Sequence, residues 1–143
     1  MKTLGFIFSF IFSMSVWADM SVVGKWKTIN EEGQSTSVVE ITQDGETIIG
    51  KVIQITDPSK AAALCDKCKG DNAHQPILGM QILTGLKETK KGEEWSGGQI
   101  LDPKNGKTYK CLLHPKAEGK KLEVRGYIGF SLLGRTQVWE KAD

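Results

Sequence analysis

The three cysteines are the residues of this 143-residue chain whose types and spacing best suit chemistry. Cys65 and Cys68 form a Cys-Asp-Lys-Cys pair, and Cys111 lies in a later strand-like segment. In an oxidising compartment a disulfide is the first interpretation. A Cys68 to Cys111 bridge would restrict the unfolded chain by about 4 kcal/mol, and a Cys65 to Cys68 bridge by only about 2 kcal/mol. Proximity along the chain favours the short bridge, which we prefer, with Cys111 as a buried thiol. The long bridge stays an alternative.

Two other uses of these cysteines are a zinc site and thiol exchange. Cys65, Cys68 and His74, with Cys111 joining in space, would make a Cys3His set that suits zinc, but only the first pair has motif-like spacing. Lys67 and Lys69 would favour a thiolate, yet thioredoxin-like chemistry needs the pair ahead of a helix in a β-α-β unit, which the sequence lacks. We therefore predict no metal, no cofactor and no catalytic residue, and we do not expect an enzyme.

The elements that must position these residues are mostly strands. Asp44-Gly45, the Asp102–Gly106 run and Glu118-Gly119 are turn signals between apolar, strand-like segments. The exception is the insert at 56–76, where the Ala-rich run Lys60–Lys69 after Asp57-Pro58-Ser59 predicts one short helix. The predicted strands are 22–28, 37–42, 48–55, 77–86, 95–101, 107–113, 122–128 and 134–140.

Eight strands joined mostly by hairpin turns predict an all-β fold, an eight-stranded up-and-down antiparallel barrel with the short helix between its third and fourth strands. Closure is favoured because it removes the exposed edges of an open sheet. A two-sheet sandwich is the main alternative. The length suits one domain with one core, which we place at 19–143.

The N-terminus reads as an export signal. Lys2 is followed by the apolar run Leu4–Met14 and by Val16-Trp17-Ala18, which predicts a signal peptide over 1–18 with cleavage after Ala18. The run is shorter than the roughly 20 residues of a spanning helix, so we predict no transmembrane segment. The 19 basic side chains less Lys2 leave 18, against 17 acidic ones. This near balance argues against a nucleic-acid partner.

The stretch Gly24-Lys25-Trp26 places a small and a large residue on one face of the first strand. Together with the strand count it resembles the calycin group, the lipocalins and their barrel relatives. The resemblance implies that Trp26 closes one end of the barrel beneath an arginine from a late strand. Arg135 is the first choice for that arginine and Arg125 the second.

Several blocks in order give a closer resemblance over nearly the whole mature chain. The chain is similar to an uncharacterised family of exported bacterial proteins, a domain of unknown function, and this similarity implies a Gram-negative periplasm. The blocks are Gly24–Thr28, Leu64–Gly70, Trp95–Gly98, Leu101–Pro103, Asn105–Tyr109, and Arg125–Gly129 with Trp139.

We hypothesise a periplasmic binding protein that holds a small, mainly apolar ligand in its barrel, because eight-stranded barrels are either filled by side chains or hold one such ligand. Met80, Tyr109, Tyr127 and Trp139 are the predicted lining residues. A packed barrel that contacts an envelope protein through its insert is the alternative. A thiol redox or zinc protein using Cys65 and Cys68 is the third. The sequence leaves the oligomeric state open.

Overall fold

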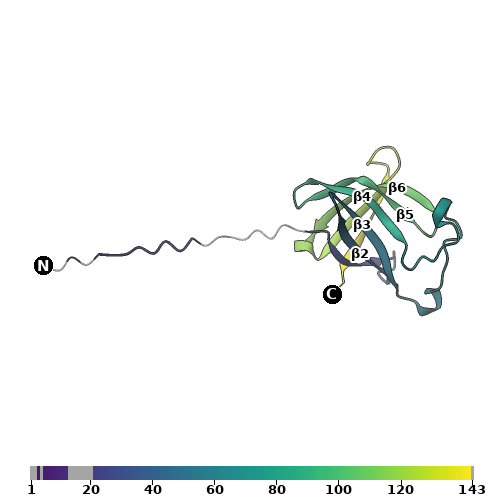
Figure 1. Ribbon diagram of the computed structural model, residues 1–143, viewed down its shortest axis with the longest axis horizontal. Helices are drawn as coiled ribbons and strands as arrows, with labels where there is room; N and C mark the ends of the chain where they lie inside the picture. The colour runs from purple at the N-terminus through teal and green to yellow at the C-terminus, as the bar shows by residue number, and fades with distance from the viewer. Residues whose placement is uncertain (1–2, 4, 13–20, 143) are drawn as a thin grey trace.

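The computed structural model describes residue 3, residues 5–12 and residues 21–142 (Figure 1). The predicted cleavage point after Ala18 lies outside the described residues. The described part of the apolar N-terminal run leads away from the barrel, and large side chains such as Phe6 and Ile7 are at least 85% exposed. This stretch adds nothing to the core of the domain.

Eight antiparallel strands form a closed barrel in which each strand pairs with its neighbours in sequence and β8 pairs back to β1. This confirms the predicted barrel and excludes the sandwich. The strands are β1 Gly24–Ile29, β2 Ser35–Asp44, β3 Thr47–Ile55, β4 Gln81–Lys90, β5 Glu94–Asp102, β6 Lys107–Lys116, β7 Lys121–Tyr127 and β8 Gly134–Lys141.

The insert between β3 and β4 departs from the prediction. The helix expected over Lys60–Lys69 is absent, and only two single 3-10 turns occur, η1 Pro58–Lys60 and η2 Gly70–Asn72. The backbone around Leu64 instead forms an antiparallel bridge with Pro76, and the Cys65 amide donates to the Gln75 carbonyl at 2.8 Å. Long-range bonds thus replace the local ones that a helix would need. The Ile77 amide likewise donates to the Ala63 carbonyl within the insert, and β4 begins at Gln81 rather than at Ile77.

A further 3-10 turn, η3 Ala117–Gly119, joins β6 to β7 at the predicted Glu118-Gly119 turn. It lies at the same end of the barrel as Val22, the β2–β3 turn and the C-terminus. The loops of the opposite end are 30–34, 56–80, 103–106 and 128–133. We call the end with Val22 the closed end and the end with these four loops the open end, because their side chains pack differently.

Inward-facing side chains are packed at the closed end and progressively exposed toward the open end. Trp26 and Trp139 are at most 1% exposed, and Leu122 pairs directly with Trp139. Side chains alternate faces along a strand, so Thr28 and Tyr109 lie on the same inward faces as the buried Trp26 and Cys111, yet both are only half-buried. The closed half of the barrel is a core, and the open half is a mouth.

Trp26 fills the closed end and is held there by two contacts. Its indole nitrogen donates to the Val22 carbonyl at 2.8 Å, and the Lys141 ammonium lies 4.8 Å from its ring centroid. Gly24 leaves the space that the Lys141 ammonium occupies, which a Cβ would fill. The predicted arginine cover is therefore wrong: Arg135 pairs with Glu31 at the open end, at 3.1 Å, with both side chains at least 87% exposed. The register explains this, because Lys141 is the β8 residue opposite Trp26.

Candidate functional site at the open end

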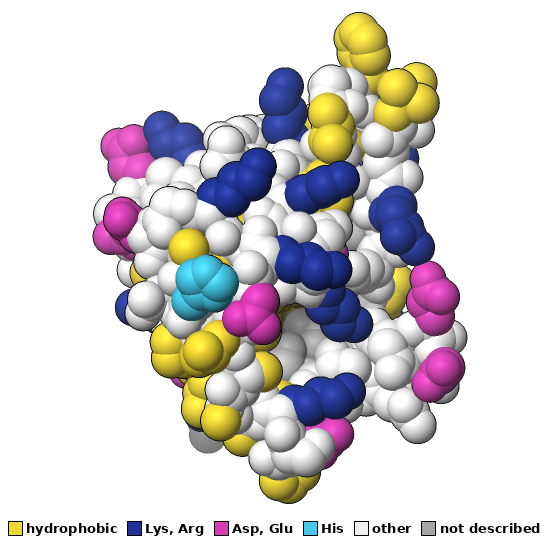
Figure 2. Space-filling view, turned by 90° about the vertical axis from the view of Figure 1, so that its right-hand side faces the viewer, with side chains coloured by type: hydrophobic (Ala, Val, Ile, Leu, Met, Phe, Trp, Pro, Cys, Tyr) yellow, Lys and Arg dark blue, Asp and Glu magenta, His cyan; other side chains and the backbone are white. Residues whose placement is uncertain are grey.

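The open end presents a hollowed, basic face. Figure 2 looks onto the side of the molecule on which the insert lies in Figure 1, and it shows a hollow with Lys and Arg side chains gathered around it. The insert and the β5–β6 turn are the two structures whose placement determines what this end can bind.

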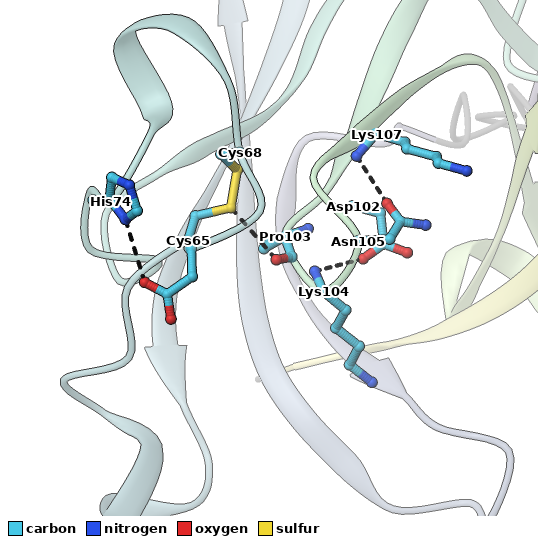
Figure 3. Close-up of a disulfide and its surroundings, with 9 residues drawn as sticks. Cys65, Cys68, His74, Asp102, Pro103, Lys104, Asn105 and Lys107 are labelled. Atoms are coloured by element: carbon cyan, nitrogen blue, oxygen red, sulfur yellow. Dashed lines mark hydrogen bonds and ion pairs between the residues drawn. A yellow bond between two sulfur atoms is a disulfide. The ribbon is translucent and has the colours of Figure 1, made fainter.

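A disulfide joins Cys65 to Cys68 in the insert, with a Cα–Cα distance of 5.3 Å, which confirms the preferred pairing. Both residues are buried, at 0% and 6% exposure. The Cys65 Sγ lies 3.4 Å from the Pro103 carbonyl oxygen, so the disulfide rests directly on the β5–β6 turn (Figure 3). The bridge and its contact fix the insert against the barrel rim.

The β5–β6 turn is rigid because its side chains bond to its own backbone. Asp102 accepts from the Lys104 amide at 2.8 Å, and Asn105 accepts from the Lys107 amide at 2.8 Å (Figure 3). These are Asx-type turns, which hold the chain without secondary structure. The Asn105 side-chain nitrogen also donates to the Tyr109 hydroxyl at 2.9 Å. The predicted turn at Asp102–Gly106 is therefore confirmed.

Gly106 lets the insert approach this turn. Its φ is +71°, which favours glycine, and a Cβ at this position would collide with the Lys67 carbonyl and lie 2.8 Å from the Cys68 nitrogen. Backbone therefore packs on backbone at this point. The segment with the cysteine pair and the turn after β5, about 40 residues later in the chain, become one rim structure.

A cleft of about 450 Å³ lies between the insert, the turn and the end of β7. Lys67, Lys69 and Lys107 bring three ammonium groups to its rim, where all three are exposed. The other polar lining groups are amides and a hydroxyl, and the apolar lining includes Leu101 and Ile128. The full lining set is Lys67, Cys68, Lys69, Asn72, Leu101, Asn105, Gly106, Lys107, Thr108 and Ile128.

A second recess of about 280 Å³ lies at the closed end, beside Val22 and Trp95. Its polar lining is acidic and neutral rather than basic: it includes Glu46 and Glu88. Glu46 is already paired with Lys87 at 3.1 Å. The two recesses therefore differ in the charge of their linings.

The four residues predicted to line a ligand cavity do not gather in either recess. Met80 and Trp139 belong to the packed core, at 6% and 1% exposure. Tyr127 follows the inward-facing Gly126 and Val124 register by one residue, which places it on the outward face of β7. Tyr109 faces inward and touches the cleft through its bond to Asn105. A ligand-contacting role for these residues stays a prediction.

The chemistry open to the cysteines is limited by these contacts. Cys65 and Cys68 share a disulfide and are buried, so neither offers the thiolate that zinc or an exchange reaction needs in this state. Burial raises the pKa of the Cys111 thiol to about 12, which keeps it protonated and unreactive at neutral pH. Among residues 21–142 no group of three metal-ligating side chains lies together, and His74 contacts Asp66 at 3.5 Å.

Sequence reasoning missed the cleft lysines as binding groups, although Lys67 and Lys69 were noticed for their effect on the cysteines. For Lys107, the feature of the sequence that could have indicated a place at the cleft is its position directly after the Asn105-Gly106 turn. Nothing in the sequence shows that this turn meets the Cys65–Cys68 segment, because the contact between them is non-local.

The fold and the site can now be compared with known proteins. Residues 24–141 match the profile of the family described as "Uncharacterized protein conserved in bacteria (DUF2147)", and the chain belongs to this family. The match covers the whole barrel, and it agrees with the resemblance drawn from the sequence blocks.

Among solved structures, the fold is similar to that of protein HP1028 from the human pathogen Helicobacter pylori, described as belonging to the lipocalin family. The TM-score is 0.76, the identity is 21%, and the match covers 87% of this chain and 84% of that chain. At this identity the likeness concerns the fold alone. A search of curated proteins finds no match.

The described residues contain no helix with the length and apolar character needed to span a membrane.

Proposed function

We propose that this protein is an exported, lipocalin-like binding protein that holds a small molecule with an apolar body and an anionic group in the cleft at the open end. The observation that carries this proposal is the lining of the cleft, where Lys67, Lys69 and Lys107 occur together with apolar side chains. Binding pockets commonly combine an apolar lining with a few placed polar groups. The sequence predicted a small, mainly apolar ligand, and this proposal makes that ligand class more specific by adding a negative charge.

The chemistry of the lining supports a ligand that has both an anionic and an apolar part. Ammonium groups are point charges with three donors each, and they bind carboxylate or phosphate without demanding one geometry. Asn72 and Asn105 add amide groups, and Leu101 and Ile128 supply apolar surface. The bond from Asn105 to Tyr109 adds an aromatic hydroxyl at the edge of the cleft.

Export is the second part of the proposal. It is supported by the positively charged and apolar N-terminal run and by the disulfide, since disulfides persist in oxidising compartments. Expression of the full chain in a Gram-negative host, followed by osmotic-shock fractionation and intact-mass measurement, tests this part. We expect a periplasmic product whose mass equals that of a chain beginning at Asp19. A product that stays in the cytoplasm with its first residues intact would contradict export.

Calorimetric titration with dodecanoate, and with dodecanol as the uncharged analogue, tests the ligand class. We expect dodecanoate to bind at one site and dodecanol to bind at least about tenfold more weakly, because only the anion gains charge-assisted hydrogen bonds. The triple variant Lys67→Gln, Lys69→Gln, Lys107→Gln should lose most of this preference.

A matched control removes the same number of charges away from the cleft. Lys25, Lys51 and Lys116 are exposed lysines outside the cleft, and their triple replacement by Gln should leave dodecanoate binding within about twofold of the parent, because surface charges at a distance are screened. Equal losses in both triple variants would reduce the effect to net charge and remove the cleft as the site. An absence of dodecanoate binding to the parent protein would reject this ligand class.

A further inference from the structure

The loop between β7 and β8, residues 128–133, carries a cluster of exposed apolar side chains. Ile128 is 66% exposed, Phe130 78%, Leu132 89% and Leu133 72%. Most large apolar residues of the domain lie in its core, and exposed apolar clusters on a soluble domain mark interaction sites. Phe130, Leu132 and Leu133 form what we call the apolar tip. Figure 1 shows this loop projecting beyond the barrel, and Figure 2 shows apolar side chains gathered where it protrudes.

The tip is held outward by specific bonds. The Arg125 Nε donates to the Ser131 carbonyl at 2.7 Å, and its Nη1 donates to the Thr136 hydroxyl at 2.8 Å. The Leu133 amide donates to the Phe130 carbonyl at 3.0 Å, which closes a turn at the end of the loop. Arg125 thus braces the base of the loop from the outward face of β7, while the apolar side chains are exposed to solvent.

The charges next to the tip are mostly positive. Arg125 bonds to the loop itself, and Arg135 lies two residues after the end of the loop. Lys110 pairs with Tyr127 at the base of the loop, and Lys107 shares the cleft lining with Ile128. Of these four cations, Arg135 contacts an acidic residue, Glu31, in an exposed ion pair. Exposed ion pairs of this kind are weak and do not neutralise a surface.

We propose that the apolar tip inserts into the surface of an anionic lipid bilayer, with the neighbouring basic residues on the headgroups. A narrow protruding loop suits a bilayer better than a second protein, because it offers depth rather than the broad flat area of a stable protein interface. Apolar insertion joined with basic residues is how peripheral proteins bind anionic membranes. Because Ile128 belongs to both the loop and the cleft, this docking places the cleft close to the lipid surface.

Vesicle co-sedimentation tests the proposal with the protein recovered from cells expressing the full chain. Vesicles of phosphatidylglycerol and phosphatidylethanolamine should pellet the parent protein, and phosphatidylcholine vesicles should pellet much less of it. The variant Phe130→Ser, Leu132→Ser, Leu133→Ser should bind the anionic vesicles at least about tenfold more weakly, since three apolar side chains no longer enter the bilayer. Replacement of Arg135 and Lys110 by Gln should weaken binding by about fivefold for each charge.

The matched control replaces three exposed apolar residues elsewhere on the barrel. Val23, Ile53 and Val138 are 40–42% exposed, and their triple replacement by Ser should leave vesicle binding within about twofold of the parent. Circular dichroism of each variant checks that the barrel is intact. Parent protein that ignores anionic vesicles, or a tip variant that binds them as the parent does, overturns the proposal.

A direct probe distinguishes insertion from attraction by charge alone. In Phe130→Trp, anionic vesicles should shift the emission of the added tryptophan to shorter wavelength, and bromine-labelled lipid chains should quench it. An added tryptophan whose emission is neither shifted nor quenched overturns insertion even if the protein pellets. Sedimentation velocity without lipid tests self-association, and a parent dimer that the tip variant loses, with no vesicle binding, would assign the tip to a second copy. Because no fatty acid is present, the result is independent of the ligand proposal.

Discussion

The two ends of this barrel are built from the same strands, but one end is packed with side chains and the other carries a cleft. At the closed end Trp26 fills the space between strands, its indole nitrogen bonds to Val22, and Lys141 covers its ring. At the open end the inward faces carry smaller or half-exposed side chains, and the insert and turn leave a cleft of about 450 Å³. Stability and a place for a ligand are therefore separated along the barrel axis. Mutations at the closed end should therefore change stability, and mutations in the cleft should change ligand binding.

The largest expected effect is at the closed end. Trp26→Ala should lower the free energy of unfolding by about 3–5 kcal/mol, because a fully buried aromatic side chain is lost and a cavity remains. Tyr109→Ala at the open end, where the side chain is half-buried, should lower it by only about 1–2 kcal/mol. Urea denaturation followed by circular dichroism measures both. Equal losses would contradict the division of the barrel into a packed and an open half.

The next effect tests how the insert is fixed at the open end. Gly106→Ala should destabilise by about 2–4 kcal/mol, because an alanine Cβ meets the Lys67 carbonyl and the positive φ adds strain. Hydrogen exchange should quicken at the amides of Cys65, His74 and Ile77, which bond within the insert.

Gly33→Ala is the matched control for that change. Gly33 has φ +79° in another open-end turn, but no atom lies within 4 Å of the position a Cβ would take. Strain alone should cost about 1 kcal/mol, without faster exchange in the insert. If the two glycine variants behave alike, the close contact with Lys67 is not what holds the insert.

A smaller effect depends on pH and concerns the barrel wall between the two ends. Burial raises the pKa of Cys111 from 9.0 to about 12 in the folded protein. Between these values the unfolded chain releases the thiol proton and the folded chain keeps it, so this group's contribution is present below about pH 9 and is lost as the pH rises toward about 12. Near pH 10 the loss should be about 1 kcal/mol.

Cys111→Ala isolates the contribution of the thiol, because all other ionisable groups are the same in both proteins. The difference in unfolding free energy between parent and variant should shrink from about pH 8 to about pH 10 in urea titrations. A constant difference over that range would show that the Cys111 thiol does not carry the pH dependence. A thiol reagent at neutral pH should also leave Cys111 unmodified until the protein unfolds.

The smallest effect compares the two cations considered as the cover of Trp26. Lys141→Met should cost about 0.5–1 kcal/mol, since it removes an ammonium from the face of the indole ring. Arg135→Met should change stability by less than about 0.5 kcal/mol, because its pair with Glu31 is exposed. Thermal unfolding of both variants at matched salt measures the difference. A larger loss for Arg135 would reverse the assignment of the cover.

The disulfide shows how far sequence reasoning reached at the site. Spacing favoured Cys65 with Cys68, and the structure pairs them, because two cysteines three residues apart need only a local turn to meet. The predicted helix around them failed for the opposite reason. Alanine propensity is a weak local preference, and the bridge of Leu64 to Pro76 and the contact with Pro103 override it.

By itself, the sequence determined that there are eight strands in hairpin order, and it favoured the closed barrel and the short disulfide over the sandwich and the long bridge, since alternation, turn residues and neighbouring cysteines are local properties of the chain. Only the tertiary structure decided that Lys141 rather than Arg135 covers Trp26, because that choice depends on the register in which β8 returns to β1. The cleft was decided in the same way. Lys67 and Lys107 lie far apart in the chain, and they share one rim because Gly106 allows the insert to pack on the turn.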